Sequence, residues 1–158
     1  MKQFLWVTNT NENKAYYADC PKRGLRLHFD KEIDASLKKD ILTFIKYLRR
    51  DFYFPVKCHV YFKNVTNWPS KKKGHTCTGI FFSNEERKGT YPQIHVAADI
   101  GDTSKYNIFF TICHELTHYF QWYFLLEDTH SDKGLEIQAS HYANRIVNDY
   151  YDEFGDNS

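Results

Sequence analysis

The chain has 158 residues, a length that predicts a single domain over residues 1–158. Hydrophobic residues make up 42% of it and aromatic residues 18%, which is enough apolar material to bury a core. Its 21 Lys and Arg nearly balance its 20 Asp and Glu, which argues against a general affinity for nucleic acid or anionic membranes. No apolar run approaches the roughly 20 residues that span a bilayer, and the first residues turn polar too soon for a signal peptide. We therefore expect a soluble, cytoplasmic protein.

Short strands and one helix are expected in the first two thirds of the chain. Leu25, Leu27 and Phe29 alternate with polar residues, a pattern typical of a half-buried strand. Between Asp34 and Arg50, apolar residues recur at helical spacing, and Asp34 is a suitable N-cap. The expected strands cover residues 4–8, 25–30, 56–62, 76–82 and 93–98.

Two helices are expected in the last third. Residues 101–104 supply capping side chains for a long helix that ends near Leu126. A polar loop over residues 127–134 then leads to a last helix, from about Leu135 to Tyr150. This order of elements predicts the α+β fold class, with a small mixed sheet and helices packed in layers.

The four cysteines are scattered along the chain and form no CxxC pair, which argues against a zinc ribbon or a thioredoxin-like redox site. A chain of this length does not need disulfide bonds to fold. We expect the thiols to be reduced: Cys20, Cys58, Cys77 and Cys113.

The segment His114-Glu115-Leu116-Thr117-His118 carries the most specific pattern in the sequence, HExxH. Residues four apart on a helix project from the same face, so both imidazoles can bind one metal ion. Glu115 lies one position round the helix, where its carboxylate can take a proton from water beside the metal. The flanking residues are apolar, and unpaired polar groups are costly to bury there, which favours a zinc site over two structural histidines.

A catalytic zinc needs a third protein ligand and an open position. The metzincin pattern, with Gly three and His six residues after the second histidine, is excluded because Gln121 and Phe124 stand there. The acidic and histidine side chains of residues 127–130 lie on the wrong side of the helix or in a loop that does not fix them. Glu136 is therefore the predicted third ligand.

Small residues around Glu136 support this prediction. Ala139, Ser140 and Ala143 share one stripe of the last helix with Glu136, so that helix can approach the HExxH helix closely. The alternative interpretation is ordinary tight packing, with Glu136 complementing the dipole of its own helix.

The HExxH helix, the polar connector and the following Glu-x-x-Ala helix resemble the gluzincin branch of the zincin metallopeptidases, and the small size is similar to the ImmA/IrrE-like proteases. The resemblance covers roughly residues 91–150. It implies a zincin-like fold, in which a small sheet packed on a helix is followed by an active-site helix and a C-terminal glutamate helix. It also implies a zinc-dependent peptidase with metal ligands His114, His118 and Glu136, a Zn²⁺ cofactor and Glu115 as general base.

The same resemblance gives the strand before the active-site helix a role in substrate binding. Gln93 to Ala98 is expected to be an edge strand whose free backbone groups pair with a peptide or protein substrate. An oxyanion-stabilising residue is also expected, and His130, His141 and Tyr142 are the candidates.

Two other functions fit the sequence less well. One is a non-catalytic module that keeps the zincin scaffold as a regulatory or protein-binding domain. The other is a DNA-associated metalloprotease resembling the SprT-like group, which would use the loop around Lys71, Lys72 and Lys73. We expect that loop to be simply solvated, because the overall charge is balanced. Residues 1–33 match no element of these families.

Overall fold

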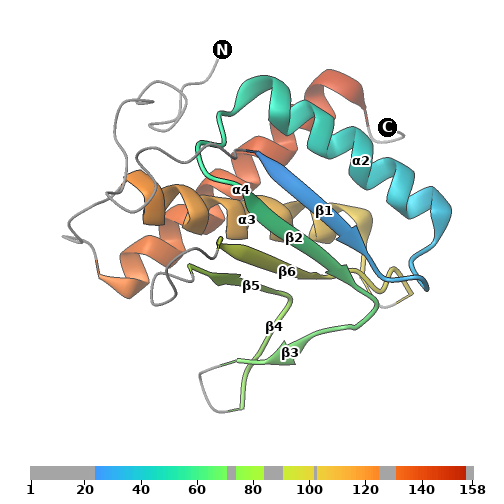
Figure 1. The fold of residues 1–158 in the computed structure, drawn as a ribbon, viewed down its shortest axis with the longest axis horizontal. Helices are drawn as coiled ribbons and strands as arrows, with labels where there is room; N and C mark the ends of the chain where they lie inside the picture. Colours follow the sequence, from blue (N-terminus) through green and yellow to red (C-terminus); the bar gives the residue numbers. More distant parts are fainter. Residues whose placement is uncertain (1–23, 71–73, 84–90, 102, 125–130, 156–158) are drawn as a thin grey trace.

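The computed structural model describes residues 24–70, 74–83, 91–101, 103–124 and 131–155. Three helices and six strands occur in these segments, so the predicted α+β class is confirmed (Figure 1). The strands are β1 (Leu25–Phe29), β2 (Cys58–Lys63), β3 (Trp68–Pro69), β4 (Thr76–Cys77), β5 (Gly79–Phe82) and β6 (Gln93–Ala97). The helices are α2 (Ala35–Asp51), α3 (Lys105–Phe124) and α4 (Asp132–Phe154). The strand expected at residues 4–8 lies outside the described residues.

A four-stranded sheet with the order β1-β2-β6-β5 forms one layer of the fold. β1, β2 and β6 run parallel, and α2 provides the crossover between β1 and β2. β5 pairs antiparallel with β6. One face of the sheet is apolar and packs under the helices, because Val60, Ile94 and Val96 are completely buried there.

The topology corrects one prediction. Gln93 to Ala98 is not an edge strand, because β6 is hydrogen-bonded to β2 on one side and to β5 on the other. Its backbone groups are therefore already paired. In the described part of the chain, β5 is the edge strand that lies on the side of α3.

Capping side chains set where two of the helices begin. Asp34 accepts hydrogen bonds from the backbone N–H groups of Ser36 and Leu37, as predicted for the start of α2. Ser131 caps α4 by accepting from Gly134 N, so this helix starts at Asp132, three residues before the predicted position. α4 also runs on to Phe154 rather than ending at Tyr150, and it ends at the C-cap Gly155, whose positive φ of 80° favours glycine.

The three helices share one aromatic core. The ring of Phe44 on α2 stacks on Phe109 of α3 with centroids 4.3 Å apart, and meets Tyr150 of α4 edge-on at 4.9 Å. These contacts fix α3 between the sheet and α4. Within the described residues no helix is long and apolar enough to cross a membrane, and Cys58, Cys77 and Cys113 are free thiols, as expected.

Candidate metal centre

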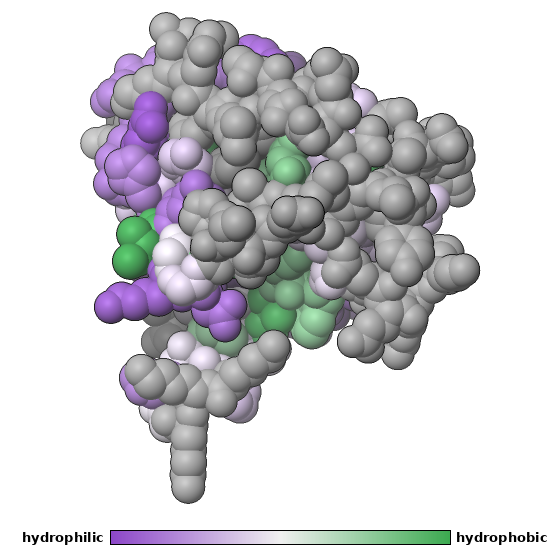
Figure 2. Space-filling model, turned by 90° about the vertical axis from the view of Figure 1, so that its left-hand side faces the viewer, coloured by the Kyte–Doolittle hydropathy of each residue, from purple (hydrophilic) through white to green (hydrophobic). Residues whose placement is uncertain are grey.

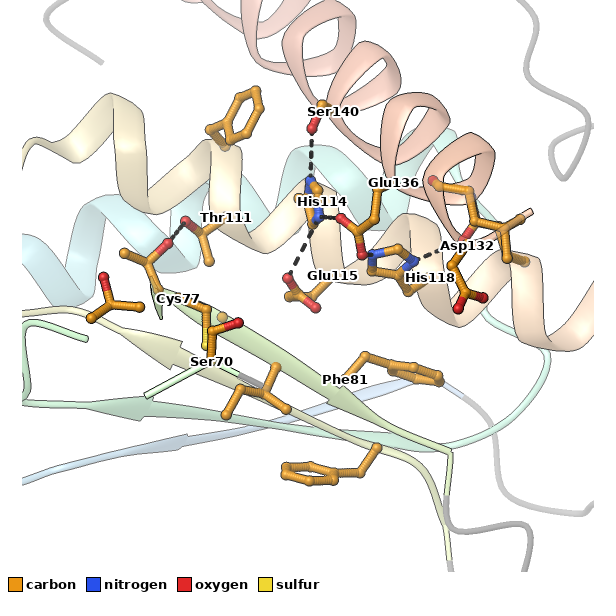
Figure 3. Close-up of a pocket in the computed structure, with 18 of the residues that line it drawn as sticks. Ser70, Cys77, Phe81, Thr111, His114, Glu115, His118, Asp132, Glu136 and Ser140 are labelled. Carbon is orange, nitrogen blue, oxygen red and sulfur yellow. Dashed lines mark hydrogen bonds and ion pairs between the residues drawn. The ribbon is translucent and has the colours of Figure 1, made fainter. Parts of the chain in front are cut away.

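The HExxH segment occupies the middle of α3, and its two histidines lie one turn apart on the face that looks towards α4. Their ring centroids are 4.9 Å apart and the rings are nearly perpendicular, at 80°. Glu136 projects from the second turn of α4 towards both rings (Figure 3). The structure thus brings the two histidines and Glu136 together.

One carboxylate joins the two imidazoles. Nε2 of His114 lies 2.9 Å from Oε2 of Glu136, and Nε2 of His118 lies 2.9 Å from Oε1 of the same side chain. Oε2 of Glu115 lies 4.0 Å from Nε2 of His114, beside this group rather than within it. The arrangement has three potential ligand side chains and, beside them, a second carboxylate, that of Glu115.

The three donor atoms fit a divalent cation such as zinc. They lie within 4.8 Å of one another. Tetrahedral zinc with N and O ligands at about 2.1 Å needs donor atoms about 3.4 Å apart, a value between this 4.8 Å limit and the 2.9 Å contacts that each imidazole makes with one oxygen of Glu136. The Glu136 side chain is 60% exposed and therefore free to shift by the small amount needed. Two imidazoles and one carboxylate are also a common donor set of catalytic zinc sites, with room for a fourth ligand.

Burial shapes the electrostatics of the centre. Glu115 is 7% exposed, and loss of hydration, reinforced by the charge of Glu136, raises the pKa of its carboxyl group to about 8 in the metal-free protein. Burial also lowers the pKa of His114, with a further contribution from His118, although Glu136 opposes it. His114 is thereby favoured in the neutral form that binds metals.

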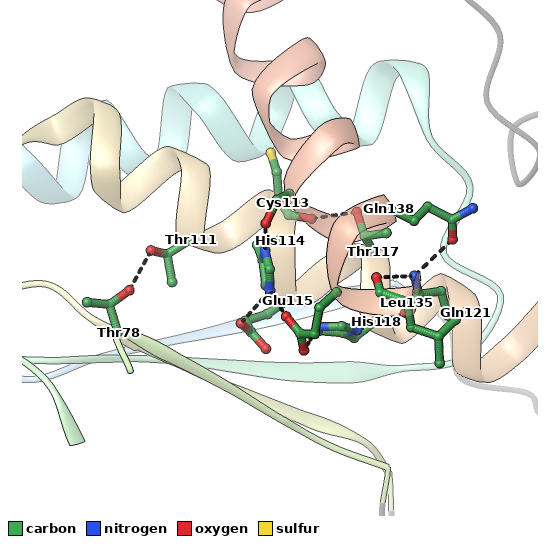
Figure 4. Close-up of polar contacts among 12 residues, drawn as sticks. Thr78, Thr111, Cys113, His114, Glu115, Thr117, His118, Gln121, Leu135 and Gln138 are labelled. Carbon is green, nitrogen blue, oxygen red and sulfur yellow. Dashed lines mark hydrogen bonds and ion pairs between the residues drawn. The ribbon is translucent and has the colours of Figure 1, made fainter. Parts of the chain in front are cut away.

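Each imidazole also has a polar partner at its other nitrogen, Ser140 for His114 (Figure 3) and Gln121 for His118 (Figure 4). Nδ1 of His118 lies 2.8 Å from Oε1 of Gln121, and Nδ1 of His114 lies 3.3 Å from Oγ of Ser140. Such contacts orient metal-binding histidines. Gln121 was not predicted, although its position three residues after His118 places it on the same side of the helix.

The centre opens into a cleft of about 1390 Å³ between α3, α4 and β5. The short β3–β4 hairpin projects over one end of it, and in the space-filling view hydrophobic side chains reach the surface just above this hairpin (Figure 2). Polar and small side chains line the end near the hairpin: Ser70, Thr76, Cys77, Thr78 and Thr111. Apolar side chains line much of the rest, including Phe81, Phe110, Trp122 and Leu135.

β5 forms the floor of the cleft and presents a free strand edge to it. Ala97 N–H donates to the carbonyl of Thr78, and the antiparallel pattern then alternates, so that the N–H and C=O groups of Gly79 and Phe81 point away from β6. None of the described residues pairs with this outer side of β5.

The candidates for oxyanion stabilisation do not reach the cleft where the structure describes them. His141 is exposed on α4, and Tyr142 packs against the core; neither lines the cleft. His141 and Tyr142 follow Glu136 by five and six residues, so they lie on other faces of α4 than Glu136 does. His130 and the lysines at 71–73 lie outside the described residues.

The chain was compared with known proteins in three ways. No protein-family model, no curated protein and no solved structure matches it. The HExxH motif and the geometry of α3, α4 and β5 are therefore the features that bear on function.

Proposed function

We propose that this protein is a zinc-dependent peptidase in which His114, His118 and Glu136 hold the metal and Glu115 is the general base. One observation carries the proposal. The Nε2 atoms of His114 and His118 each lie 2.9 Å from an oxygen of the Glu136 carboxylate, and the buried carboxyl group of Glu115 lies 4.0 Å from Nε2 of His114 in the same cleft. A structural zinc site is normally closed by four protein ligands and has no use for an adjacent free carboxyl group. This arrangement supports hydrolysis.

When bound, a zinc ion at these donors supplies a Lewis acid that polarises a peptide carbonyl and makes water more acidic. Glu115 takes a proton from the attacking water molecule while the water oxygen forms the new bond to the carbonyl carbon. The same carboxyl group then gives that proton to the amide nitrogen as the C–N bond breaks.

The cleft favours an extended peptide as substrate. Its volume exceeds the 300 to 1,000 Å³ or so that is typical of sites for small ligands. The outward backbone groups of Gly79 and Phe81, which no strand in the described part of the chain pairs, would bind such a peptide as an added strand, next to Glu115. Because polar side chains line one end and aromatic side chains another, we expect cleavage next to an apolar residue.

Metal analysis and two substitutions test the proposal. The purified protein should contain one zinc per chain and should hydrolyse a library of unstructured peptides. Glu115→Gln should retain the zinc and lose hydrolysis by a factor of about 100 or more, as expected for loss of a general base. Glu136→Ala should lose zinc.

Either of two results contradicts the proposal. If the protein binds zinc and Glu115→Gln cleaves peptides as fast as the wild type, Glu115 is not the general base. If the wild type binds zinc and cleaves no peptide, the scaffold is a non-catalytic binding module. The DNA-associated alternative rests on the lysines at 71–73, and no described residue favours it.

A further inference from the structure

Gln121 is a buried amide that connects α3 with the beginning of α4. It lies one turn after His118, is 5% exposed, and has three hydrogen-bond contacts. Its Nε2 donates to the carbonyl of Leu135 at 3.0 Å and to Oε1 of Gln138 at 2.9 Å. Its Oε1 lies 2.8 Å from Nδ1 of His118 (Figure 4). All the polar atoms of this side chain are therefore engaged.

The carbonyl of Leu135 fixes the orientation of the amide. A backbone carbonyl only accepts hydrogen bonds, so the NH₂ group of Gln121 must face α4. The amide oxygen of Gln121 must then face His118, and this oxygen also only accepts. Nδ1 of His118 is consequently the nitrogen that carries a hydrogen in this contact.

We infer that Gln121 is a positioning residue, which holds His118 with a hydrogen on Nδ1, so that Nε2, the nitrogen on the side of Glu136, is the one that binds the metal ion. The inference rests on the proposed metal centre, because only an Nε2 without a proton binds a metal ion. Gln121 also contacts Leu135 and Gln138, so it connects His118 to the part of α4 that carries Glu136.

Ser140 provides an internal comparison. It lies near Nδ1 of the other imidazole, that of His114, but at the longer distance of 3.3 Å, and Ser140 itself is exposed. A hydroxyl group can donate as well as accept, so Ser140 does not determine which nitrogen of His114 carries the hydrogen. Removing Ser140 should therefore weaken the centre less than removing the amide of Gln121.

Three variants separate the contact with His118 from the connection to α4. Gln121→Met keeps the size of the side chain and removes both functions. Gln121→Glu keeps an acceptor for His118 but has no NH₂ group for Leu135 or Gln138. Ser140→Ala is the matched control at the other imidazole. The zinc dissociation constant of each variant is measured by competition with a chelator, and the melting temperature is measured on the metal-free proteins.

Gln121→Met should bind zinc about 10- to 100-fold more weakly than the wild type, the usual effect of losing such a partner. Gln121→Glu should bind zinc within about threefold of the wild type or more tightly, and Ser140→Ala should lose less affinity than Gln121→Met. Both Gln121 variants should melt at lower temperature, because both lose the bonds to α4. If Gln121→Met binds zinc like the wild type, or if Gln121→Glu binds as weakly as Gln121→Met, the inference is overturned.

A second measurement does not depend on zinc. In metal-free Glu136→Ala, the imidazole nitrogen chemical shifts of neutral His118 should report a hydrogen on Nδ1. In Glu136→Ala combined with Gln121→Met, the hydrogen should shift towards Nε2. The same shifts in both proteins would contradict the positioning role even if zinc binds, whereas a clear difference without any zinc binding would leave Gln121 as inferred and refute only the proposed peptidase.

Discussion

Gly79 lies so close to Glu115 that a Cβ atom at position 79 would come within 2.8 Å of Glu115 Cγ and 3.0 Å of its Oε2. The same atom would also lie 2.6 Å from Cγ2 of Thr111. Both neighbours are buried side chains on α3 and have little room to move. The absence of a side chain at position 79 thus allows β5 to approach the carboxyl group of Glu115.

Gly79→Ala should therefore displace either β5 or Glu115 while leaving the metal ligands in place. We expect peptide hydrolysis to fall about 10- to 100-fold, since small misplacements of a reacting group have effects of this size, with unchanged zinc content. Steady-state rates and metal analysis check this. Gly101→Ala, at an exposed glycine outside the cleft, is the control and should behave like the wild type.

Ala143 tests the close approach of α4 to α3. It is completely buried, on the same face of α4 as Glu136 and Ser140. Ala143→Leu should push the two helices apart, lowering the free energy of unfolding by about 1–3 kcal/mol and weakening zinc binding. Denaturant unfolding and chelator competition measure the two effects. His141→Leu, at an exposed position on the same helix, should change neither, and lost activity in that variant would revive His141 as a catalytic candidate.

Tyr119 joins the HExxH helix to the segment before β2. Its hydroxyl group accepts from Val56 N–H at 2.9 Å and donates to the Val56 carbonyl at 2.6 Å, and both residues are completely buried. Tyr119→Phe leaves two buried backbone groups unsatisfied, so we expect a loss of about 1–3 kcal/mol in the free energy of unfolding by urea. Tyr106→Phe, which removes exposed bonds to Asn144 and Asn148, should cost about 0.5 kcal/mol or less. Equal losses would refute the role assigned to Tyr119.

Two histidines on the face of the sheet that is turned away from the helices should make the stability of the fold depend on pH. His59 and His95 lie on this face, and partial burial lowers the pKa of both, with Lys57 adding to the effect at His59 and Lys63 at His95. The folded state then binds fewer protons than the unfolded state, where histidine has a pKa of about 6.5. This contribution to stability is complete above pH 6.5 and is lost as the pH falls below it.

Melting temperatures at pH 7.5 and 5.5 measure this dependence. Replacing both histidines by glutamine should reduce the drop in melting temperature between the two pH values. The difference between the two drops reports the contribution of His59 and His95, including the contact of His59 Nδ1 with His28 Nε2 at 2.9 Å. A drop of the same size in the variant would mean that these imidazoles titrate as they do in the unfolded chain.

The sequence predicted that His114, His118 and Glu136 lie together better than it predicted the order of the strands. The i, i+4 spacing of His114 and His118 determines that they share a helix face, and the small residues Ala139 and Ala143 indicate where a second helix approaches. These are local properties of helices. The lateral order of strands depends on pairing between distant segments, and hydrophobic alternation shows only which face of a strand is buried. For this reason the sequence predicted the edge strand at Gln93 to Ala98, whereas among the described strands β5 is at the edge.

The contacts by which Gln121 positions His118 could not be predicted from the sequence, for a related reason. Gln121 acts through the carbonyl of Leu135 and the side chain of Gln138, and these contacts depend on how α3 and α4 cross. Nothing in the spacing of residues determines that crossing. The short distance between Gly79 and Glu115 likewise depends on tertiary contacts. The chain bends at Thr78, and the Thr78 hydroxyl group is hydrogen-bonded to that of Thr111 at 3.0 Å.

The division of the donors between α3 and α4 bears on how the protein is made. A ribosome synthesises His114, Glu115 and His118 before it reaches Glu136. A chain that ends between these two segments would therefore have both histidines and Glu115 but would lack the third metal ligand. If the proposed activity is correct, such fragments could not assemble a competent centre. Newly synthesised neighbours would then be exposed to hydrolysis only by full-length, folded molecules.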